Sequence, residues 1–261
     1  RRSGVEKRHS VLLETGQGSA LERQDFFRPA MDQQFAGPST AQRMARFQEL
    51  APGLAMASCR VALDAARLTP ADIDHLVTVS CSGFSAPGVD IELIQLLDLS
   101  PAVSRTNIGF MGCYAALSAL RTADALAIAD PGANVLVCAT ELCTLHHQYS
   151  SDPQQMVANS LFGDGSAAMI VSTQPAADNA WQRIAQTSTL IPETAGQMSW
   201  SIGDHGFVMT LSAEVPRTIG KSLRAWLSAW LLQHDLSIGD IDHWAVHPGG
   251  PRILSATAEA I

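Results

Sequence analysis

Residues 109–113 (Gly-Phe-Met-Gly-Cys) contain the side chain best suited to covalent chemistry. Cys113 stands between a glycine-bearing turn and an alanine- and leucine-rich run to Leu126, the pattern of a strand or loop that leads into a helix. Backbone N–H groups and the positive end of a helix dipole favour a thiolate, and lower cysteine pKa values to about 3.5–7.5 in favourable sites. Cys113 is therefore a candidate nucleophile, although a cysteine among apolar residues is more often a small buried side chain.

His247 is the second candidate for chemistry. It follows a short apolar segment that we predict to be a strand, and it precedes a Gly249-Gly250 turn that would let a substrate come close. A neutral imidazole can stabilise a thiolate or donate a hydrogen bond to a developing oxyanion. Because ligand sites in α/β sheets favour strand ends, we expect Cys113 and His247 to converge. The alternative is a solvated histidine in a turn.

An internal repeat indicates that two similar halves position these residues. The segment 68–76 (LTPADIDHL) recurs as 236–244 (LSIGDIDHW), 168 residues later. Each copy follows a helical pattern and precedes a predicted strand, the first ending at Cys81 and the second at His247. A duplicated α/β unit with a shared core is expected, with halves at residues 1–173 and 174–261.

The spacing of apolar residues predicts the other elements. Helices are expected over residues 40–67, with a tolerated proline in an early turn, and over 91–97, 113–126 and 215–233. Strands are expected over residues 102–108, 134–139, 181–191 and 207–212, with a turn feeding a buried strand over 161–171. Residues 174–179 are expected to connect the halves, and the segment after Glu141, with Asp152-Pro153, reads as polar.

Composition excludes several classes of function. The net charge of −8 argues against a nucleic-acid partner, because phosphate backbones need a basic surface. No apolar run approaches a membrane span and no signal peptide opens the chain, so we expect a soluble, cytoplasmic protein. Five cysteines, an odd number, fit reduced thiols better than a disulfide framework.

Other arrangements of reactive residues are weaker. Cys138, Cys143, His146 and His147 are metal-ligand types, but their spacing matches no established zinc pattern, so we expect no metal. The sequence contains no Gly-x-Ser-x-Gly elbow, no Gly-x-Gly-x-x-Gly fingerprint and no P-loop. The chemistry therefore falls to cysteine.

Five motifs resemble the type III polyketide synthases, the chalcone-synthase-like members of the thiolase superfamily. They are Gly112-Cys113 opening a helix, residues 161–165 (LFGDG), Ser82-Gly83 followed by Pro87-Gly88, residues 203–207 (GDHGF) leading to Val215-Pro216, and residues 247–251 (HPGGP). The similarity runs through nearly the whole chain, and residues 203–207 look more like bacterial alkylresorcinol or alkylpyrone synthases than like plant enzymes. The resemblance implies a thiolase-like duplicated αβαβα layered fold, truncated here at both ends.

The resemblance also implies roles for single residues. Cys113 matches the nucleophile that accepts the starter acyl group from coenzyme A, and His247 matches the residue that stabilises the enolate of decarboxylated malonyl-CoA. Phe162 matches the aromatic gate between the coenzyme A tunnel and the reaction cavity. Met209 lies at the second gate position, where plant enzymes have Phe, and so predicts a softer, more adaptable wall.

Further positions match the cavity wall and the entrance. Cys81 and Cys143 fall where plant enzymes commonly have Thr, and Ala86 falls on a loop that reaches into the partner subunit's cavity. Lys7 and Arg8, in a basic cluster with Arg1 and Arg2, match the segment that meets the coenzyme A phosphates, although most charge clusters are only solvated surface.

The implied activity is iterative condensation of an acyl-CoA starter with malonyl-CoA, followed by cyclisation to an alkylpyrone or resorcinol-type product. The resemblance implies a homodimer, coenzyme A thioesters as substrates and no resident cofactor. One family residue is missing: Cys113 lies 38 residues after His75, so the second-half counterpart of Cys113, where the family has its catalytic asparagine, would lie beyond Ile261. A single-round β-ketoacyl synthase and a catalytically incomplete acyl-binding or dimerisation fragment are the alternatives.

Overall fold

A four-stranded mixed sheet is the centre of the computed structural model, which describes residues 4–32, 34–174 and 180–261. Its strand order is β2-β1-β3-β4. The strands are β1 (His75–Ser80), β2 (Ser104–Gly109), β3 (Asn134–Leu142) and β4 (Asp164–Ser172). β1 is parallel to β2 and β3, whereas β4 is antiparallel to β3. The carboxyl ends of the three parallel strands therefore meet at one edge, where the sequence predicts its reactive residues.

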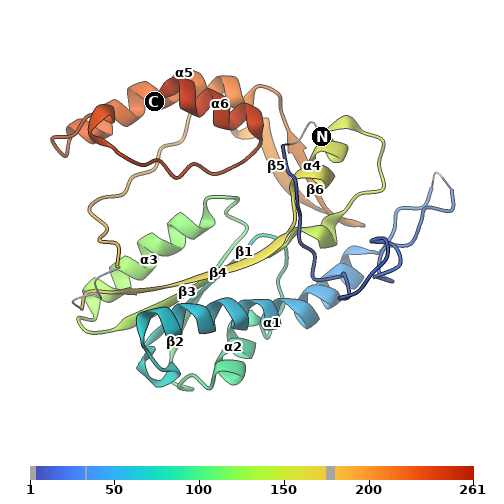
Figure 1. Cartoon of the computed structure of the whole chain (residues 1–261), viewed down its shortest axis with the longest axis horizontal. Helices are drawn as coiled ribbons and strands as arrows, with labels where there is room; N and C mark the ends of the chain where they lie inside the picture. The colour runs from blue at the N-terminus through green and yellow to red at the C-terminus, as the bar shows by residue number, and fades with distance from the viewer. Residues whose placement is uncertain (1–3, 33, 175–179) are drawn as a thin grey trace.

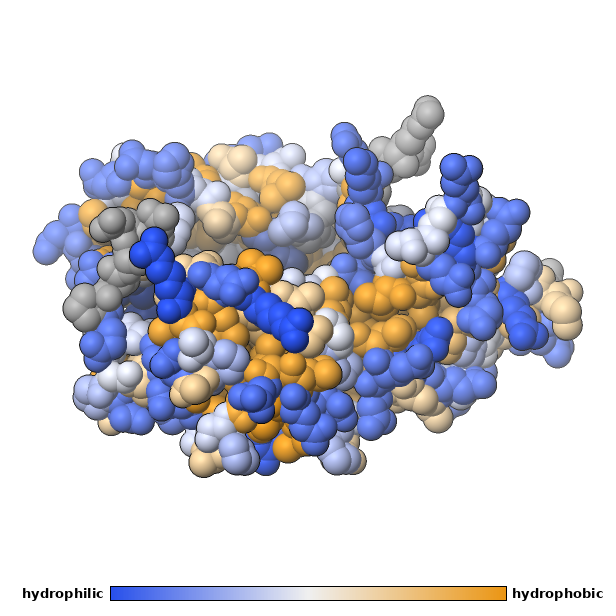
Figure 2. Space-filling model, turned by 60° about the horizontal axis from the view of Figure 1, so that its bottom comes forward, coloured by the Kyte–Doolittle hydropathy of each residue, from blue (hydrophilic) through white to orange (hydrophobic). Residues whose placement is uncertain are grey.

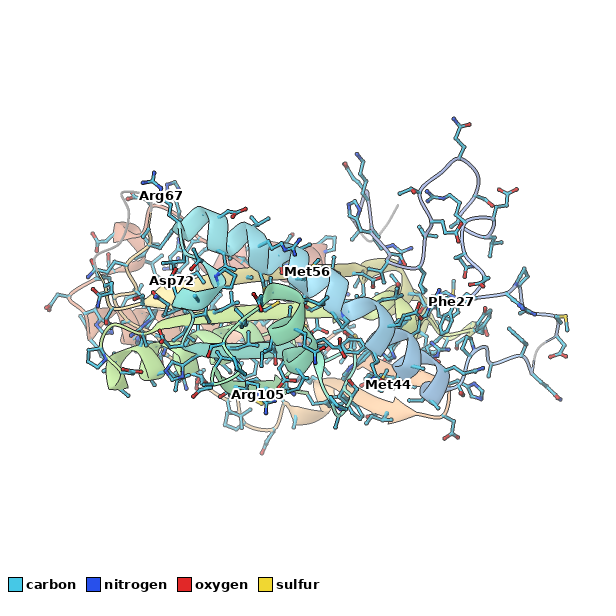
Figure 3. The ribbon with its side chains drawn as sticks, turned by 90° about the horizontal axis from the view of Figure 1, so that it is seen from below. Phe27, Met44, Met56, Arg67, Asp72 and Arg105 are labelled. Carbon is cyan, nitrogen blue, oxygen red and sulfur yellow. The ribbon has the colours of Figure 1, made fainter. Side chains whose placement is uncertain are left out.

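Two helices, α1 (Thr40–Ala66) and α2 (Val89–Leu97), cover one face of the sheet (Figure 1). The capping box of Ser39 and Gln42 starts α1, and its apolar side chains, among them Ala55, Cys59 and Leu63, pack on β1 and β3. Figure 3 shows α1 crossing the strands, with Met44 near its start and Met56 farther along. Pro52 lies near the middle of this 27-residue helix and not in an early turn, which corrects the prediction.

The other face of the sheet is covered by α3 (Ala115–Ala129). Its buried stripe consists of alanines at every fourth position, Ala115, Ala119, Ala123 and Ala127. Such small side chains let the helix approach the sheet closely, and they pack on the alternate valines of β1 and β3. The outer surface over α1 and α2 carries apolar side chains between charged ones (Figure 2). The predicted helix–strand–helix order of the first half is confirmed.

The second part contains the hairpin β5 (Met198–Gly203) and β6 (Gly206–Leu211), followed by α5 (Val215–Leu232) and α6 (Pro251–Ala260). Thr40 fixes the hairpin to the start of α1, because its backbone N–H donates to Asp204 O at 2.8 Å and its hydroxyl accepts from Gly206 N at 2.8 Å. α5 and α6 pack together on the side of the sheet that α3 occupies (Figure 1).

One prediction in the later chain is corrected. Residues 181–191 form no strand; their large apolar side chains Trp181 and Leu190 are 95% and 82% exposed, with no neighbouring strand to pair with in the described chain. The polar segment after Glu141 contains a helix that the sequence analysis did not specify, α4 (Pro153–Leu161), which Asp152 starts by accepting hydrogen bonds from Gln154 N and Gln155 N. The predicted connection at residues 174–179 falls almost wholly outside the described residues.

The internal repeat is confirmed up to the point where its strands should begin. Arg67 and Asp235, 168 residues apart, both have φ 57° after a helix. A capping box then follows in each copy, Thr69 with Asp72 and Ser237 with Asp240. Figure 3 shows Arg67 and Asp72 at the same end of α1. After the first turn the chain enters β1, but after the second it stays irregular up to α6, so the predicted strand before His247 is absent.

Candidate active site

A tight turn between β2 and α3 presents Cys113. Phe110 and Gly112 have φ values of 57° and 77°, a region that glycine adopts without strain, and Gly112 O accepts from Ala115 N at 3.0 Å. The thiol residue is exposed and lies two positions before the first residue of α3. The prediction of a cysteine on a glycine turn at a helix start is therefore confirmed.

The electrostatic surroundings of Cys113 differ from the prediction. Removal of water from the thiol raises its pKa, and the negative charge of Glu141 raises it further. The backbone N–H of Cys113 itself acts in the opposite direction, but more weakly. The expected lowering by the helix start is thus outweighed, first by the loss of water around the thiol and then by the charge of Glu141 at the end of β3.

Glu141 was not predicted, and it organises the site. Its carboxylate accepts hydrogen bonds from the Cys81 backbone N–H at 2.8 Å and from the Ser82 hydroxyl at 2.5 Å. Burial nevertheless raises the pKa of Glu141, since these bonds only partly replace water. No local motif marks this residue; its position follows from the pairing of β1 with β3, which brings their ends together.

The two cysteines predicted to line the cavity lie beside this carboxylate. The Cys81 thiol donates to Gly112 O at 3.7 Å, and burial followed by the charge of Glu141 raises its pKa. Cys143 follows β3 directly; burial, and then the charge of Glu141, raise its pKa strongly. The charge of Glu141 therefore acts on three thiols from three segments of the chain.

A cavity of about 280 Å³ lies next to Cys143. It is enclosed by the N-terminal segment, the turn after β3, α4 and the β5–β6 hairpin. Four of the predicted site residues line it: Arg8, Cys143, Phe162 and Met209. The structure thus gathers the predicted gate residues and one predicted entrance residue around one space. Cys113 and Cys81 do not line it, but their charges act on Cys143, which does.

An aromatic cluster forms one wall of this cavity and was missed in the sequence. His146 stacks on Phe207 with 4.1 Å between ring centroids, while its Nε2 bonds Ser82 O at 2.6 Å and its Nδ1 accepts from Phe207 N at 2.9 Å. These bonds assign the neutral ring, and burial lowers the pKa of His146 to about 4. Trp200 donates from Nε1 to Cys81 O at 2.7 Å and so joins the hairpin to the thiol cluster.

The remaining predicted residues lie at the edges of the site. Arg8 donates to the carbonyl oxygens of Asn159 and Phe162 at the end of α4, whereas Lys7 is exposed and does not line the cavity. Ala86 is exposed on the loop between β1 and α2. Arg1 and Arg2 lie outside the described residues.

His247 does not meet Cys113 in this structure. It is exposed in the irregular segment before α6, and within the described residues no hydrogen bond or ion pair joins it to the thiol. The expected convergence required a second parallel strand ending at His247, and that strand is absent.

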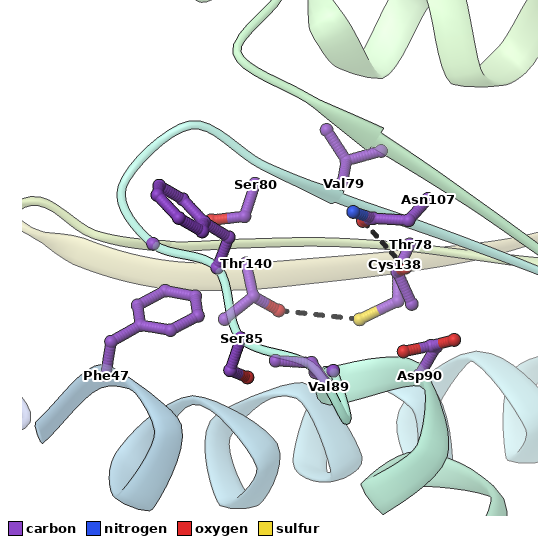
Figure 4. A pocket seen from close by; sticks show the side chains of 13 residues that line it. Phe47, Thr78, Val79, Ser80, Ser85, Val89, Asp90, Asn107, Cys138 and Thr140 are labelled. Atoms are coloured by element: carbon purple, nitrogen blue, oxygen red, sulfur yellow. Dashed lines mark hydrogen bonds between the residues drawn. The ribbon is translucent and has the colours of Figure 1, made fainter. Parts of the chain in front are cut away.

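A second, smaller cavity of about 60 Å³ lies between the sheet and α1 (Figure 4). The polar side chains that line it bond to one another: the Thr78 hydroxyl donates to Asn107 Oδ1 at 3.1 Å, and the Cys138 sulfur lies 3.5 Å from the Thr140 hydroxyl.

Across the described ranges, no group of three or more His, Cys, Asp or Glu side chains could hold a metal ion. The helices in these ranges also include none that could cross a membrane.

Comparison with known proteins places these features in a family. The model of the chalcone and stilbene synthase N-terminal domain matches residues 22–175. The α-pyrone synthesis polyketide synthase-like Pks18 of Mycobacterium tuberculosis is 34% identical over 223 residues, which are 84% of this chain and 57% of that protein. The 1,3,6,8-tetrahydroxynaphthalene synthase of Streptomyces peucetius is 34% identical over 217 residues, 81% of this chain and 58% of that protein.

Solved structures agree with the sequence comparison. The type III polyketide synthase domain of Steely1 from Dictyostelium superposes with a TM-score of 0.80 at 34% identity, covering 85% of this chain and 63% of that one. PKS-I of the brown alga Ectocarpus siliculosus gives 0.81 at 32% identity, covering 85% and 60%. The predicted thiolase-like fold is confirmed, and this chain spans less than two thirds of the length of these relatives. The chain belongs to the chalcone and stilbene synthase family, the type III polyketide synthases.

Proposed function

We propose that this chain provides the loading site of a type III polyketide synthase that condenses an acyl-CoA starter with malonyl-CoA. The observation that carries the proposal is the cavity lined by Arg8, Phe162, Met209 and Cys143, because the charge of the candidate nucleophile Cys113 acts on Cys143 in its wall. An acyl chain would occupy the apolar part of this cavity. Arg8, at its edge, would meet the coenzyme A phosphates, with Lys7 nearby in the chain.

In the loading step the Cys113 thiolate attacks the thioester carbonyl of the starter. The bond from that carbon to the coenzyme A sulfur breaks, and the acyl group is held as a thioester on Cys113. Coenzyme A leaves as a thiolate and takes up from solvent the proton that the Cys113 thiol released. Cys81 and Cys143 would flank this acyl group. The raised pKa of Cys113 means that the thiolate forms more readily at alkaline pH.

In the extension step malonyl-CoA loses carbon dioxide, and the resulting enolate attacks the thioester on Cys113. A carbon–carbon bond forms and the Cys113 thiolate is released. We assign to His247 the hydrogen bond that stabilises the enolate oxygen. Repeated rounds and cyclisation would give an alkylpyrone or alkylresorcinol-type product.

We also propose that the protein is a homodimer, with Ala86 near the partner's cavity, and that it is cytoplasmic. We place the boundary between the two halves at residue 173, and we propose that the enzyme has no resident cofactor.

A second candidate function is loading without condensation. The lack of a hydrogen bond or ion pair between His247 and Cys113 in the described ranges supports it, because such a chain could accept an acyl group without stabilising an enolate. Such a chain would form the acyl-thioester but would release no extended product.

Mass spectrometry of the protein and of its small-molecule extract, after incubation with a long-chain acyl-CoA and malonyl-CoA, tests both functions. A cyclised product together with an acyl adduct on Cys113 is the expected result. An adduct alone would identify the loading function, and a linear β-ketoacyl product would identify a single-round enzyme. Cys113→Ala should lose adduct and product, whereas the matched Cys138→Ala should keep both; product formed by Cys113→Ala would overturn the assignment.

A further inference from the structure

Two of the thiols on which the charge of Glu141 acts, those of Cys81 and Cys113, follow neighbouring strands of the sheet. Ser80 and Gly109, the last residues of β1 and β2, are register partners, and Phe110 N donates to Ser80 O at 3.4 Å. Cys81 is the next residue after β1. Cys113 follows β2 after a turn that reverses the chain, so that Gly112 O lies 3.7 Å from the Cys81 sulfur. The backbone therefore holds Cys81 against the residue that precedes Cys113.

The thiols are also close enough to influence one another's ionisation. The charge on Cys113 acts on both Cys81 and Cys143, and the charge on Cys81 acts on Cys143. Cys113 is exposed and Cys81 is partly exposed, so a small solute in water can reach this pair. By contrast, Cys59 and Cys138 are 0% and 2% exposed inside the core.

We propose that Cys81 and Cys113 form a reversible disulfide when the protein meets hydrogen peroxide. The Cys113 thiolate attacks a peroxide oxygen, the O–O bond breaks, and hydroxide leaves as Cys113 becomes a sulfenic acid. The Cys81 thiolate then attacks the sulfenic sulfur, and a second hydroxide leaves as the S–S bond forms. The two thiol protons convert the hydroxides to water, so two thiols are oxidised and one peroxide is reduced.

Cys81, and not Cys143, is the resolving thiol. Burial, and then the charges of Glu141 and Asp164, raise the pKa of Cys143 more strongly than the pKa of Cys81 is raised. Cys143 therefore stays more fully in the uncharged thiol form. Because the thiolate is the attacking species in disulfide chemistry, Cys143 reacts more slowly. The Cys81 thiol is also in contact with the turn that holds Cys113, through Gly112 O at 3.7 Å.

The bond would regulate and protect the nucleophile. The disulfide itself is independent of the proposed function, and only its effect on acyl loading rests on that function. A sulfur bonded to Cys81 cannot accept an acyl group, and it is also shielded from irreversible oxidation to sulfinic and sulfonic acids. Reduction by a thiol would restore the free Cys113.

The test uses the whole chain, fully reduced and then treated with equimolar hydrogen peroxide. Remaining thiols are alkylated under denaturing conditions, and peptides are mapped by mass spectrometry. We expect a cross-linked peptide pair containing Cys81 and Cys113, the loss of two hydrogen atoms from the intact mass, and full reversal by dithiothreitol. Because both thiols have raised pKa values, the cross-link should form faster as the pH rises above neutral.

Two variants make the assignment specific. Cys143→Ser should form the same cross-link, whereas Cys81→Ser should form none; with equimolar peroxide it should hold Cys113 as the sulfenic acid, and a second equivalent should convert this to sulfinic acid. Circular dichroism checks that both variants are folded. The proposal is overturned if the wild-type chain gives sulfinic acid on Cys113 without a cross-link, or if the cross-link contains Cys143. Acylation of the reduced protein is measured in parallel, so a chain that cross-links but does not acylate contradicts only the proposed function.

Discussion

The hydroxyl of Ser82 donates a 2.5 Å hydrogen bond to Glu141, and its oxygen also accepts from Leu142 N at 2.8 Å. This one side chain therefore joins the loop after β1 to the end of β3. The pairing holds the Glu141 carboxylate among the thiols, where its charge raises the pKa of Cys113. The acidity of the candidate nucleophile thus depends on a contact between strand ends that are 59 residues apart in sequence.

Glu141→Gln should make Cys113 more reactive at neutral pH. The amide keeps an oxygen that can accept from Ser82 but removes the negative charge that faces the thiol. Removal of this charge should lower the pKa of Cys113 and raise its thiolate fraction, and with it the alkylation rate, several-fold at neutral pH. The rate of iodoacetamide alkylation of Cys113, followed by mass spectrometry against pH, measures this.

Glu49→Gln is the matched control, since it removes the same charge from an exposed position on α1. It should leave the alkylation rate of Cys113 unchanged. Equal acceleration in both variants would mean that net charge, and not the contact with Glu141, governs the thiol.

Protonation of the buried His146 ring should make the protein less stable in mild acid. Its pKa is lowered to about 4 in the folded state from an ordinary value near 6.5, so its contribution to stability is complete above about pH 6.5 and is lost as the pH falls toward 4. The shift corresponds to about 3 kcal/mol of unfolding free energy. Urea unfolding of wild type and His146→Phe at pH 7 and pH 4.5 should give a steeper loss in the wild type; equal losses would contradict the assignment.

Arg43 should be essential for stability. Its guanidinium is fully buried and donates to Pro38 O at 2.8 Å, Leu145 O at 2.6 Å and His147 O at 2.8 Å. Burial lowers its pKa to about 10, so it stays cationic at neutral pH. Arg43→Met would leave three carbonyl groups without donors and should cost about 3 kcal/mol or more in chemical denaturation.

Arg46→Met provides the comparison on the same helix. Arg46 pairs with Glu49 at 2.7 Å in an i,i+3 contact near the surface, and such pairs contribute up to about 1 kcal/mol. A change for Arg43→Met as small as that for Arg46→Met would show that the buried hydrogen bonds contribute little.

Two glycines should respond oppositely to alanine. A Cβ at Gly83 would lie 2.2 Å from the buried Phe47 ring, so Gly83→Ala should destabilise the fold by roughly 1–3 kcal/mol. A Cβ at Gly53, within α1, meets nothing within 4 Å, so Gly53→Ala should stabilise by about 0.5–1 kcal/mol. Thermal unfolding of both variants measures the difference, and a neutral Gly83→Ala would contradict the tight packing.

The sequence predicts most of the first half because its signals are local. The glycine turn before Cys113, the apolar spacing of α1 and the continuous apolar run of β3 each lie within a few residues. The influence of Glu141 on the thiols could not be predicted in the same way, because it arises from strand order. The strand expected at residues 181–191 failed since apolar residues form a strand only when a partner strand is available.

The repeated turn after α1 and after α5 has a consequence for how the chain folds. In each copy, the hydroxyl and backbone N–H of the capping residue, Thr69 or Ser237, donate to an aspartate three residues later, at 2.6–2.8 Å. Contacts so close in sequence require little loop-closure entropy and form without waiting for distant segments. Both turns should therefore be acquired early, before the β1–β3 pairing that crosses 60 residues, and hydrogen exchange during refolding would show the two turns protected at the same stage.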